Sequence, residues 1–321
     1  MILKQRFEPP EIRQLQNLLQ RVPSVHPLFP QWTEKLRRMS AGFHGELRVD
    51  TLWQEIPIEG PHFFLHDLFI LKPSASHQID TLLVTSRFIL LLEIKSIAGR
   101  LDFDPQLRQF SRTNKDGTVD GMRNPDDQLR RHEKWVQNFL AEYKVSLPVI
   151  GAIVFTYPSS IVKSRPANRI IIQASGLPYL VDQLLAKYPV DLLSTRKTRQ
   201  LASRLLEMHS ERALRDLDVP VELRKGVLCG KCPGSIMTYH YKKWTCPNCS
   251  LVEPSAYLRT LEQYRMLIKP FISSREFRDF TGIESVSIAS KLLKESKMTF
   301  QGSFKDRVYL IPESFDTPDS I

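Results

Sequence analysis

All four cysteines of this chain lie within one 21-residue window, as the pairs Cys229-Gly-Lys-Cys232 and Cys246-Pro-Asn-Cys249 with thirteen residues between them. Two such pairs at this spacing bring four thiolates together around a tetrahedral Zn²⁺ ion. The alternative, disulfides or a redox dithiol, is disfavoured by a reducing compartment and by the lack of cysteines elsewhere in the sequence. We therefore predict a zinc ribbon whose metal is structural, because four thiolates leave no coordination position for water.

The segment between the cysteine pairs, Tyr239-His-Tyr-Lys-Lys-Trp244, interleaves aromatic and basic residues. As a single strand it would direct Tyr241 and Lys243 to one face and Trp244 to the other, because side chains alternate along a strand. Two interpretations stay open. The rings stack on nucleic-acid bases while the lysines neutralise phosphates, or one aromatic row covers the zinc site. The first predicts that Tyr241, Lys243 and Trp244 contact nucleic acid.

The composition is that of a globular protein, with 42% hydrophobic and 25% charged residues, and it excludes a largely disordered or fibrous chain. A length of 321 residues fits two or three domains. No segment approaches the ~18 to 20 apolar residues of a membrane-spanning helix, and the first residues lack the pattern of a signal peptide. We expect a cytoplasmic protein without membrane contacts. The formal charge of +10 favours nucleic acid as the partner.

The hydrophobic pattern predicts strands at residues 63–71, 77–85 and 88–96, and only Ser86-Arg87 separates the last two, which is a hairpin signal. A helix is expected over residues 126–143, followed by a buried strand. Strands around a long helix indicate a mixed α/β layered fold. Further elements are expected as helical pieces in 1–40, a helix at 45–53, strands at 149–156 and 169–173, and helices at 178–187 and 194–214.

The last 65 residues have their own pattern. Ser273-Ser-Arg-Glu276 fits a capping box, residues 285–297 fit a second helix, and residues 299–311 fit a hairpin. Helix, turn, helix, hairpin is the order of a winged helix, and the alternative is an interaction domain of the same shape. In the first interpretation the DNA contacts lie on the second helix and on the wing, at Lys291, Lys294, Lys305 and Arg307.

Three charged residues interrupt the most apolar part of the sequence. Asp80 lies in the first strand of the predicted hairpin, and Glu93 and Lys95 end the second strand. The turn at residues 86 and 87 places residue 93 opposite residue 80, because both lie the same distance from its centre. Glu93 and Lys95 are two residues apart and therefore share a face of the sheet.

Charges at such positions cost free energy unless a metal ion or an ion pair compensates them. Two facing carboxylates suit Mg²⁺ (or Mn²⁺), which prefers oxygen ligands and accepts phosphate oxygens. Such a metal lowers the pKa of a bound water and polarises a phosphate, while Lys95 orients the nucleophile or neutralises developing charge. The alternative is a structural ion pair between Lys95 and Asp80 or Glu93.

Five short motifs resemble, in order and spacing, those of the nuclease-related domain (NERD) family, a branch of the PD-(D/E)xK nuclease-like fold. They are Gly45-Glu46, Gln78-Ile-Asp80, Glu93-Ile-Lys95, Gly99 and Asn124-Pro-Asp-Asp-Gln128. The resemblance covers residues 42–157 and implies a restriction-endonuclease-like core, a mixed sheet flanked by helices. It also implies metal ligands at Asp80 and Glu93, the motif lysine at Lys95, an accessory acid at Glu46, and Gln128 facing the same site. Arg131, next to the last motif, is a candidate phosphate contact or a solvated surface charge.

The leading hypothesis is a metal-dependent nuclease acting on DNA, with a zinc ribbon and a winged helix that hold nucleic acid. The alternatives are a non-catalytic DNA-binding or regulatory protein built on a nuclease-like scaffold, and an adaptor that binds another DNA-processing protein. The expected division is a helical segment at 1–41, the nuclease-related domain at 42–190, a helical linker at 191–225, the ribbon at 226–254 and the winged-helix-like domain at 255–321.

Overall fold

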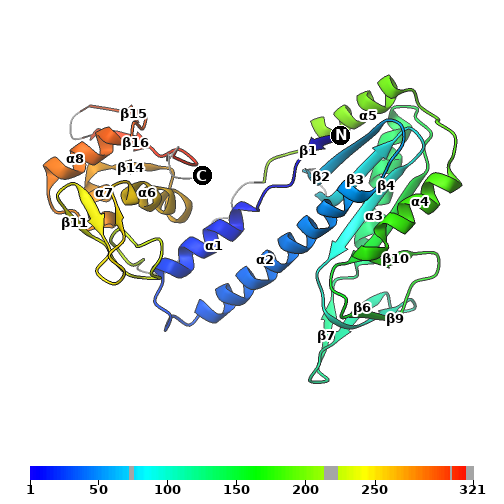
Figure 1. The fold of residues 1–321 in the computed structure, drawn as a ribbon, viewed down its shortest axis with the longest axis horizontal. Coiled ribbons are helices and arrows are strands. Elements are labelled where there is room, and N and C mark those ends of the chain that lie inside the picture. The colour runs from blue at the N-terminus through cyan, green and yellow to red at the C-terminus, as the bar shows by residue number, and fades with distance from the viewer. Residues whose placement is uncertain (72–75, 213–222, 304–305, 316–321) are drawn as a thin grey trace. The chain divides into compact units, whose positions relative to one another are not determined.

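The computed structural model describes residues 1–71, 76–212, 223–303 and 306–315. The chain forms two compact units that alternate along the sequence (Figure 1). Unit 1 comprises Met1–Glu8 and Met39–Ala213, and unit 2 comprises Pro9–Arg38 and Leu214–Ile321. The finer division into five segments stays a prediction. Among the described residues, no helix is long and apolar enough to cross a membrane.

Unit 1 is built on a six-stranded mixed sheet in the order β1-β2-β3-β4-β8-β10. The central β2, β3 and β4 are antiparallel, whereas β1, β8 and β10 pair in parallel with their neighbours. The predicted strands are confirmed within about two residues, and β1 was not predicted. The bounds are β1 Ile2–Lys4, β2 His62–Ile70, β3 His77–Thr85, β4 Ile89–Lys95, β8 Val149–Phe155 and β10 Ile170–Gln173.

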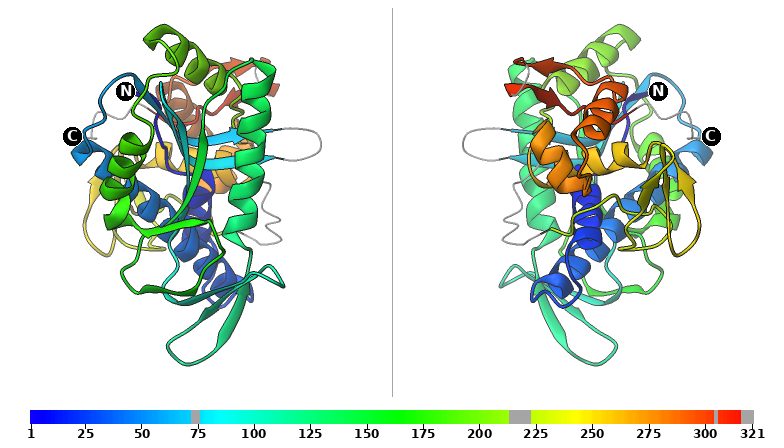
Figure 2. Two further views of the ribbon diagram at one scale, coloured as in Figure 1. Left: turned by 90° about the vertical axis from the view of Figure 1, so that its right-hand side faces the viewer. Right: turned by 90° about the vertical axis from the view of Figure 1, so that its left-hand side faces the viewer.

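Helices cover both faces of this sheet. On one face, α3 (Pro125–Glu142) and α5 (Thr195–Glu207) pack on side chains such as Leu82 and Leu91. On the other face, α2 (Phe29–Leu52) and α4 (Leu177–Lys187) pack on side chains such as Leu83 and Leu90. Figure 2 shows α3 and α4 on either side of the strands. Two short 3₁₀ turns, Trp53–Glu55 and Ala174–Gly176, follow α2 and β10.

The last of the helical pieces expected in residues 1–40 and the helix expected at 45–53 form one continuous helix, α2. Pro30 lies in the first turn of α2, where a missing backbone N–H leaves no intrahelical bond unmade. Residues 29–38 of this helix belong to unit 2 and residues 39–52 to unit 1.

A second sheet of unit 1 was not predicted. It has the order β7-β6-β5-β9, with β5 Gly99–Asp104, β6 Gln109–Thr113, β7 Val119–Met122 and β9 Ser160–Ser164. Its inward side chains, Leu101, Phe103 and Phe110, join the core under α3. Gly99 opens it with a φ of +123°, a conformation that favours glycine.

Unit 2 contains the cysteine segment and the C-terminal elements around one apolar core. Here α1 (Pro10–Arg21) packs on α6 (Ala256–Leu267). The buried Arg21 joins them, because its Nε lies 2.8 Å from Gln263 Oε1. The other elements are β11 Thr238–His240, β12 Lys243–Thr245, β13 Val252–Glu253, β14 Phe271–Ser273, α7 Ser274–Thr281, α8 Val286–Glu295, β15 Phe300–Gln301 and β16 Val308–Leu310.

The interpretation of residues 239–244 as a single strand is wrong. Tyr241 and Lys242, at φ values of +47° and +64°, form a tight turn between antiparallel β11 and β12. The turn makes Tyr239 the partner of Trp244 across the hairpin, with ring centroids 4.9 Å apart. Trp244 is 2% exposed and packs in the core with Cys229 and Cys246.

The capping box that opens α7 is confirmed, because Ser273 and Glu276 exchange both of its hydrogen bonds. Gly282 ends the helix in the left-handed conformation, and α8 follows with Leu292 and Leu293 buried. The hairpin of β15 and β16 is joined by β14 in a three-stranded sheet. The assignment of these elements as a winged helix stays a prediction, and Lys305 lies outside the described residues.

Candidate functional site

The β3–β4 hairpin has the register predicted from its two-residue turn. Thr81 pairs with Leu92, so the next positions along the strands are Asp80 and Glu93. Asp80 is 6% exposed, and its Oδ2 accepts a hydrogen bond of 2.7 Å from the backbone N–H of Ile94. Burial raises the pKa of Asp80, while Lys95 and the Ile94 hydrogen bond oppose the rise.

Glu93 and Lys95 lie side by side at the end of β4. Lys95 Nζ donates to Glu93 Oε1 and, over 3.3 Å, to Gln128 Oε1 on α3. Burial disfavours the charge on Lys95, but Glu93 and Asp80 outweigh it and raise the pKa of the lysine. The lysine is therefore protonated at neutral pH.

One oxygen of Glu93 is left without a partner. The residue is 0% exposed, and its Oε2 finds no hydrogen bond among the described residues. His132 Nδ1 lies 3.8 Å from this oxygen, too far for a hydrogen bond, and burial lowers the pKa of His132 to about 3. The imidazole is thus neutral and does not balance the carboxylate. Burial and the neighbouring Asp80 raise the pKa of Glu93 to about 8.

Glu46 reaches the same region from α2. The preceding Gly45 permits this, because a Cβ at that position would lie 1.8 Å from Ser96 Oγ at the end of β4. Burial and Asp80 raise the pKa of Glu46 to about 8, while Arg6 opposes the rise. The structure therefore brings together Glu46, Asp80, Glu93, Lys95 and Gln128, and their roles stay predictions.

Arg6 and Asp50 also belong to this site, and neither was predicted from the sequence. Arg6 donates to Glu46 Oε2 over 2.5 Å and to Asp50 Oδ2 over 2.7 Å. Asp50 follows Glu46 by four residues, so a helix over residues 45–53 carries both acids on one face, and this spacing could have identified Asp50. Arg6 carried no such signal, because its partners lie 40 or more residues away in the sequence.

Most residues of the motif Asn124-Pro-Asp-Asp-Gln128 stabilise the start of α3. Asn124 caps α3 by accepting a hydrogen bond of 2.9 Å from Asp126 N–H, and Pro125 occupies the first turn. Asp126 is buried and binds Arg130 and Arg169 through its two carboxylate oxygens. These contacts fix the start of α3, one turn before Gln128.

Arg131 is exposed on α3, three residues beyond Gln128, and Lys243, Lys291 and Lys294 are also exposed. Tyr241 is 96% exposed at its turn, whereas the prediction of a nucleic-acid contact at Trp244 is wrong because that ring is buried. Arg307 places its guanidinium 4.3 Å from the centroid of the Phe300 ring. The exposed residues stay candidates for phosphate or base contacts.

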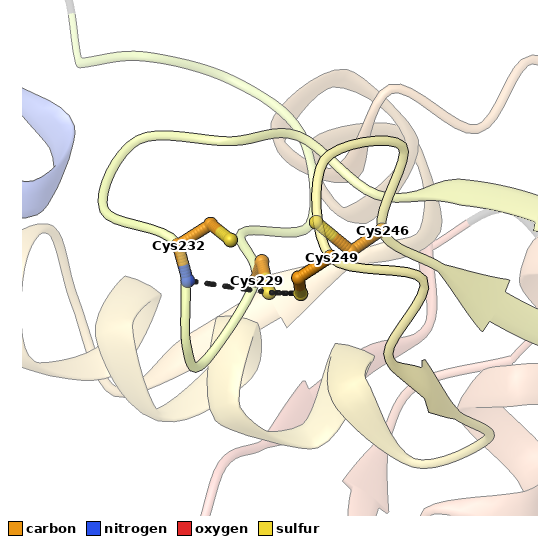
Figure 3. A group of neighbouring side chains, drawn as sticks. All are labelled: Cys229, Cys232, Cys246 and Cys249. Carbon is orange, nitrogen blue, oxygen red and sulfur yellow. Dashed lines mark hydrogen bonds between the residues drawn. The ribbon is translucent and has the colours of Figure 1, made fainter.

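The four cysteine side chains of unit 2 converge from two loops (Figure 3). Their sulfur atoms all lie within 4.8 Å of one another, and none forms a disulfide. The backbone N–H groups of Lys231 and Cys232 each donate to Cys229 Sγ over 3.4 Å. Hydrogen bonds to sulfur stabilise thiolates, so this cluster fits a soft metal ion such as zinc.

The acidic residues of unit 1 bring fewer ligand atoms together than the four cysteines do. Within the described parts of the chain, the thiolate cluster is the one group of three or more His, Cys, Asp or Glu ligand atoms within 4.8 Å of one another. The acidic residues do not form such a group of three. The donors available at the end of β4 are two carboxylates, Asp80 and Glu93, with the unpartnered Glu93 Oε2 between strand and helix.

Comparisons with known proteins agree with the motifs. Residues 41–156 match the family model of the nuclease-related domain, NERD. This confirms the resemblance drawn from the sequence and nearly coincides with the expected range of 42–157. No curated protein and no solved structure matched the chain.

Proposed function

We propose that this chain is a nuclease that hydrolyses phosphodiester bonds of DNA with a divalent metal ion, Mg²⁺ or Mn²⁺, held by Asp80 and Glu93. The observation that supports it most is the unpartnered Glu93 Oε2. Lys95 satisfies one oxygen of this carboxylate, and leaving the other buried and unpaired costs on the order of 1–3 kcal/mol or more. A cation at this oxygen offsets that cost, which a structural ion pair alone does not.

The bound metal would polarise the scissile phosphate and lower the pKa of an attacking water. Lys95 is protonated, so it serves as a hydrogen-bond donor and a positive charge toward the phosphate or the nucleophile, not as a general base. Gln128 Oε1 accepts from Lys95 Nζ and limits its rotation. Asp80 is oriented by the Ile94 N–H, which leaves its second oxygen for the metal.

Unit 2 contains the residues that we propose bind DNA. The element order α6, β14, α7, α8, β15, β16 is consistent with a winged helix, and the exposed Lys291 and Lys294 lie on α8. The exposed Tyr241 lies next to two lysines at the tip of the β11–β12 hairpin, between the two cysteine pairs (the cysteine hairpin). At this position its ring would stack on an unpaired base. Structural Zn²⁺ at the four cysteines would hold that hairpin in place.

Cleavage of single- and double-stranded DNA with Mg²⁺ or Mn²⁺ tests this proposal. We expect Lys95→Ala and Asp80→Ala to lose activity at least about a hundredfold, as removal of a group that stabilises the transition state does. Lys35→Ala, an exposed lysine on α2 far from these residues in sequence, is the matched control and should keep full activity. Equal activity in all four proteins, or none in the wild type under broad conditions, would refute it.

A non-catalytic scaffold is the second candidate, because the Lys95–Glu93 ion pair already compensates part of the buried charge. Calorimetric titration with Mg²⁺ separates the two functions. Absence of binding at millimolar Mg²⁺ favours the scaffold. The salt dependence of DNA binding distinguishes the nuclease and the scaffold from a protein adaptor. An affinity for DNA that falls steeply with salt concentration indicates phosphate contacts, which the adaptor does not need.

A further inference from the structure

Arg6 belongs to the first eight residues of the chain, which are part of unit 1 and include its edge strand β1. In β1, Ile2 and Lys4 pair in parallel with Phe64 and Leu65 of β2. Arg6 follows two residues later, and its side chain is 2% exposed. A buried guanidinium needs partners for its N–H groups, and this one has them on two different elements.

The guanidinium makes five hydrogen bonds to four residues, two of them to the carboxylate of Asp50. On α2 it donates to Glu46 Oε2 over 2.5 Å and from Nε to Asp50 Oδ2 over 2.7 Å. On β3 it donates to the carbonyl oxygen of Asp80 over 2.6 Å and to Thr81 Oγ1 over 3.2 Å. The planar guanidinium spreads its N–H donors in a fork and so reaches α2 and β3 at once. A lysine at this position would place all its donors on one nitrogen atom and could not bridge the two elements in the same way.

These contacts divide the acidic residues into two sets. Glu46 and Asp50 accept hydrogen bonds from Arg6, whereas Glu93 accepts one from Lys95 and the Asp80 carboxylate accepts one from the Ile94 N–H. Glu46 is therefore already bound to a cation of the protein itself. This agrees with the failure of the acids to form a group of three ligands.

We propose that Arg6 acts as a built-in cation of this site, which holds Glu46 in an ion pair and so restricts the metal site to Asp80 and Glu93. Arg6 is a positioning residue in this scheme, because it acts through Glu46. The inference rests on the metal site of the proposed function. It adds that Arg6 keeps Glu46 from binding the metal.

This role of Arg6 predicts that its removal increases the affinity of the site for Mg²⁺. Removing the guanidinium deletes one positive charge near the metal site and frees the Glu46 carboxylate, and both changes favour a divalent cation. Arg6→Gln should therefore bind Mg²⁺ at least about tenfold more tightly than the wild type. Arg6→Gln with Glu46→Gln removes both charges together and should return to within about threefold of wild-type affinity.

The test is a calorimetric Mg²⁺ titration of the zinc-loaded full chain, together with thermal melts with and without Mg²⁺. Mg²⁺ is chosen because thiolates bind it poorly. Arg6→Gln should show both the tighter binding and a larger Mg²⁺-induced rise in Tm. Arg13→Gln, an exposed arginine on α1, is the control and should match the wild type.

Arg6→Lys covers the case in which Arg6→Gln does not fold. It keeps the charge and loses the fork, so it should have a lower Tm than the wild type but wild-type Mg²⁺ affinity. Wild-type affinity in Arg6→Gln, or tight binding in Arg6→Lys and in the double variant, overturns the assignment of Arg6. Mg²⁺ binding without any DNA cleavage refutes the nuclease and leaves the assignment of Arg6 standing. Absence of Mg²⁺ binding in every form overturns both.

Discussion

Lys95 and Glu93 point to the same face of β4, and Lys95 Nζ donates to only one of the two carboxylate oxygens of Glu93. Lys95 therefore compensates the charge of Glu93 only in part, because Glu93 Oε2 has no partner among the described residues. The pH dependence of stability follows from this arrangement.

The stability of the Mg²⁺-free protein should fall as the pH rises from about 4.5 to about 8. Burial raises the pKa of Glu93 to about 8, so the folded state holds a proton that the unfolded chain releases in this range. This group contributes at most about 1.4 kcal/mol per pH unit. Thermal melts across this range should show the fall, and Glu93→Gln should flatten it. Stability that increases over the same range would contradict the prediction.

Gly45→Ala should destabilise the protein, because the added methyl group collides with Ser96 Oγ and comes within 2.9 Å of Thr156 Oγ1. Gly42→Ala, three residues earlier on α2, meets nothing within 4 Å and should stabilise by about 0.5–1 kcal/mol. Chemical denaturation measures both. Ser96→Ala should recover part of the Gly45→Ala loss, and equal effects of the two alanines would argue against close packing at Gly45.

Gln128→Ala should lower the rate of DNA cleavage by about tenfold, less than the loss expected for Lys95→Ala. The reason is that Gln128 orients Lys95 and does not itself carry the charge. The rate at saturating substrate is the measurement, and Arg131→Ala on the same helix serves as a control, which should affect DNA affinity before rate. A full loss of activity in Gln128→Ala would assign it a more direct role.

Zinc should be present at one ion per chain and should stabilise unit 2. Elemental analysis gives the stoichiometry, and Cys249→Ser should lower it and lower the Tm, because three thiolates bind the ion less tightly than four. Asn248→Ser changes the neighbouring exposed residue and should keep the metal. A stoichiometry well below one in the wild type would refute the zinc assignment.

Two aromatic residues of the cysteine hairpin should behave in opposite ways. Tyr241→Asn should weaken binding of single-stranded DNA without loss of stability, because Tyr241 is exposed and Asn tolerates its left-handed backbone. Trp244→Ala should destabilise by about 3–5 kcal/mol, because the ring is buried in the core of unit 2. Filter binding and denaturation measure the two effects. Unchanged DNA affinity in Tyr241→Asn would remove the hairpin tip from the binding surface.

The sequence was sufficient where local rules decide the structure. A two-residue turn fixes hairpin register, so the neighbouring positions of Asp80 and Glu93 could be predicted. The capping box of α7 is equally local. The turn at Tyr241 and Lys242 was missed because it lacks the Asn or Gly that marks such turns.

Long-range contacts account for the rest. The strands of the second sheet are short and largely polar, and the alternation of Leu101 and Phe103 in β5 is too brief to predict a strand. Arg6 is tied to residues 40, 44 and 74 positions away, and no pattern within a window of sequence contains that information.

The family match and the folded body of unit 1 do not have the same limits. The match spans residues 41–156, yet the main sheet takes β1 from before that range and β10 from after it. A fragment cut at the limits of the match would expose the β2 edge to solvent and to other chains, and it would leave Glu46 and Asp50 without their arginine. Such an expression product is expected to aggregate. Loss of activity in it would then report a missing sheet edge and a missing counterion, not an inactive catalytic centre.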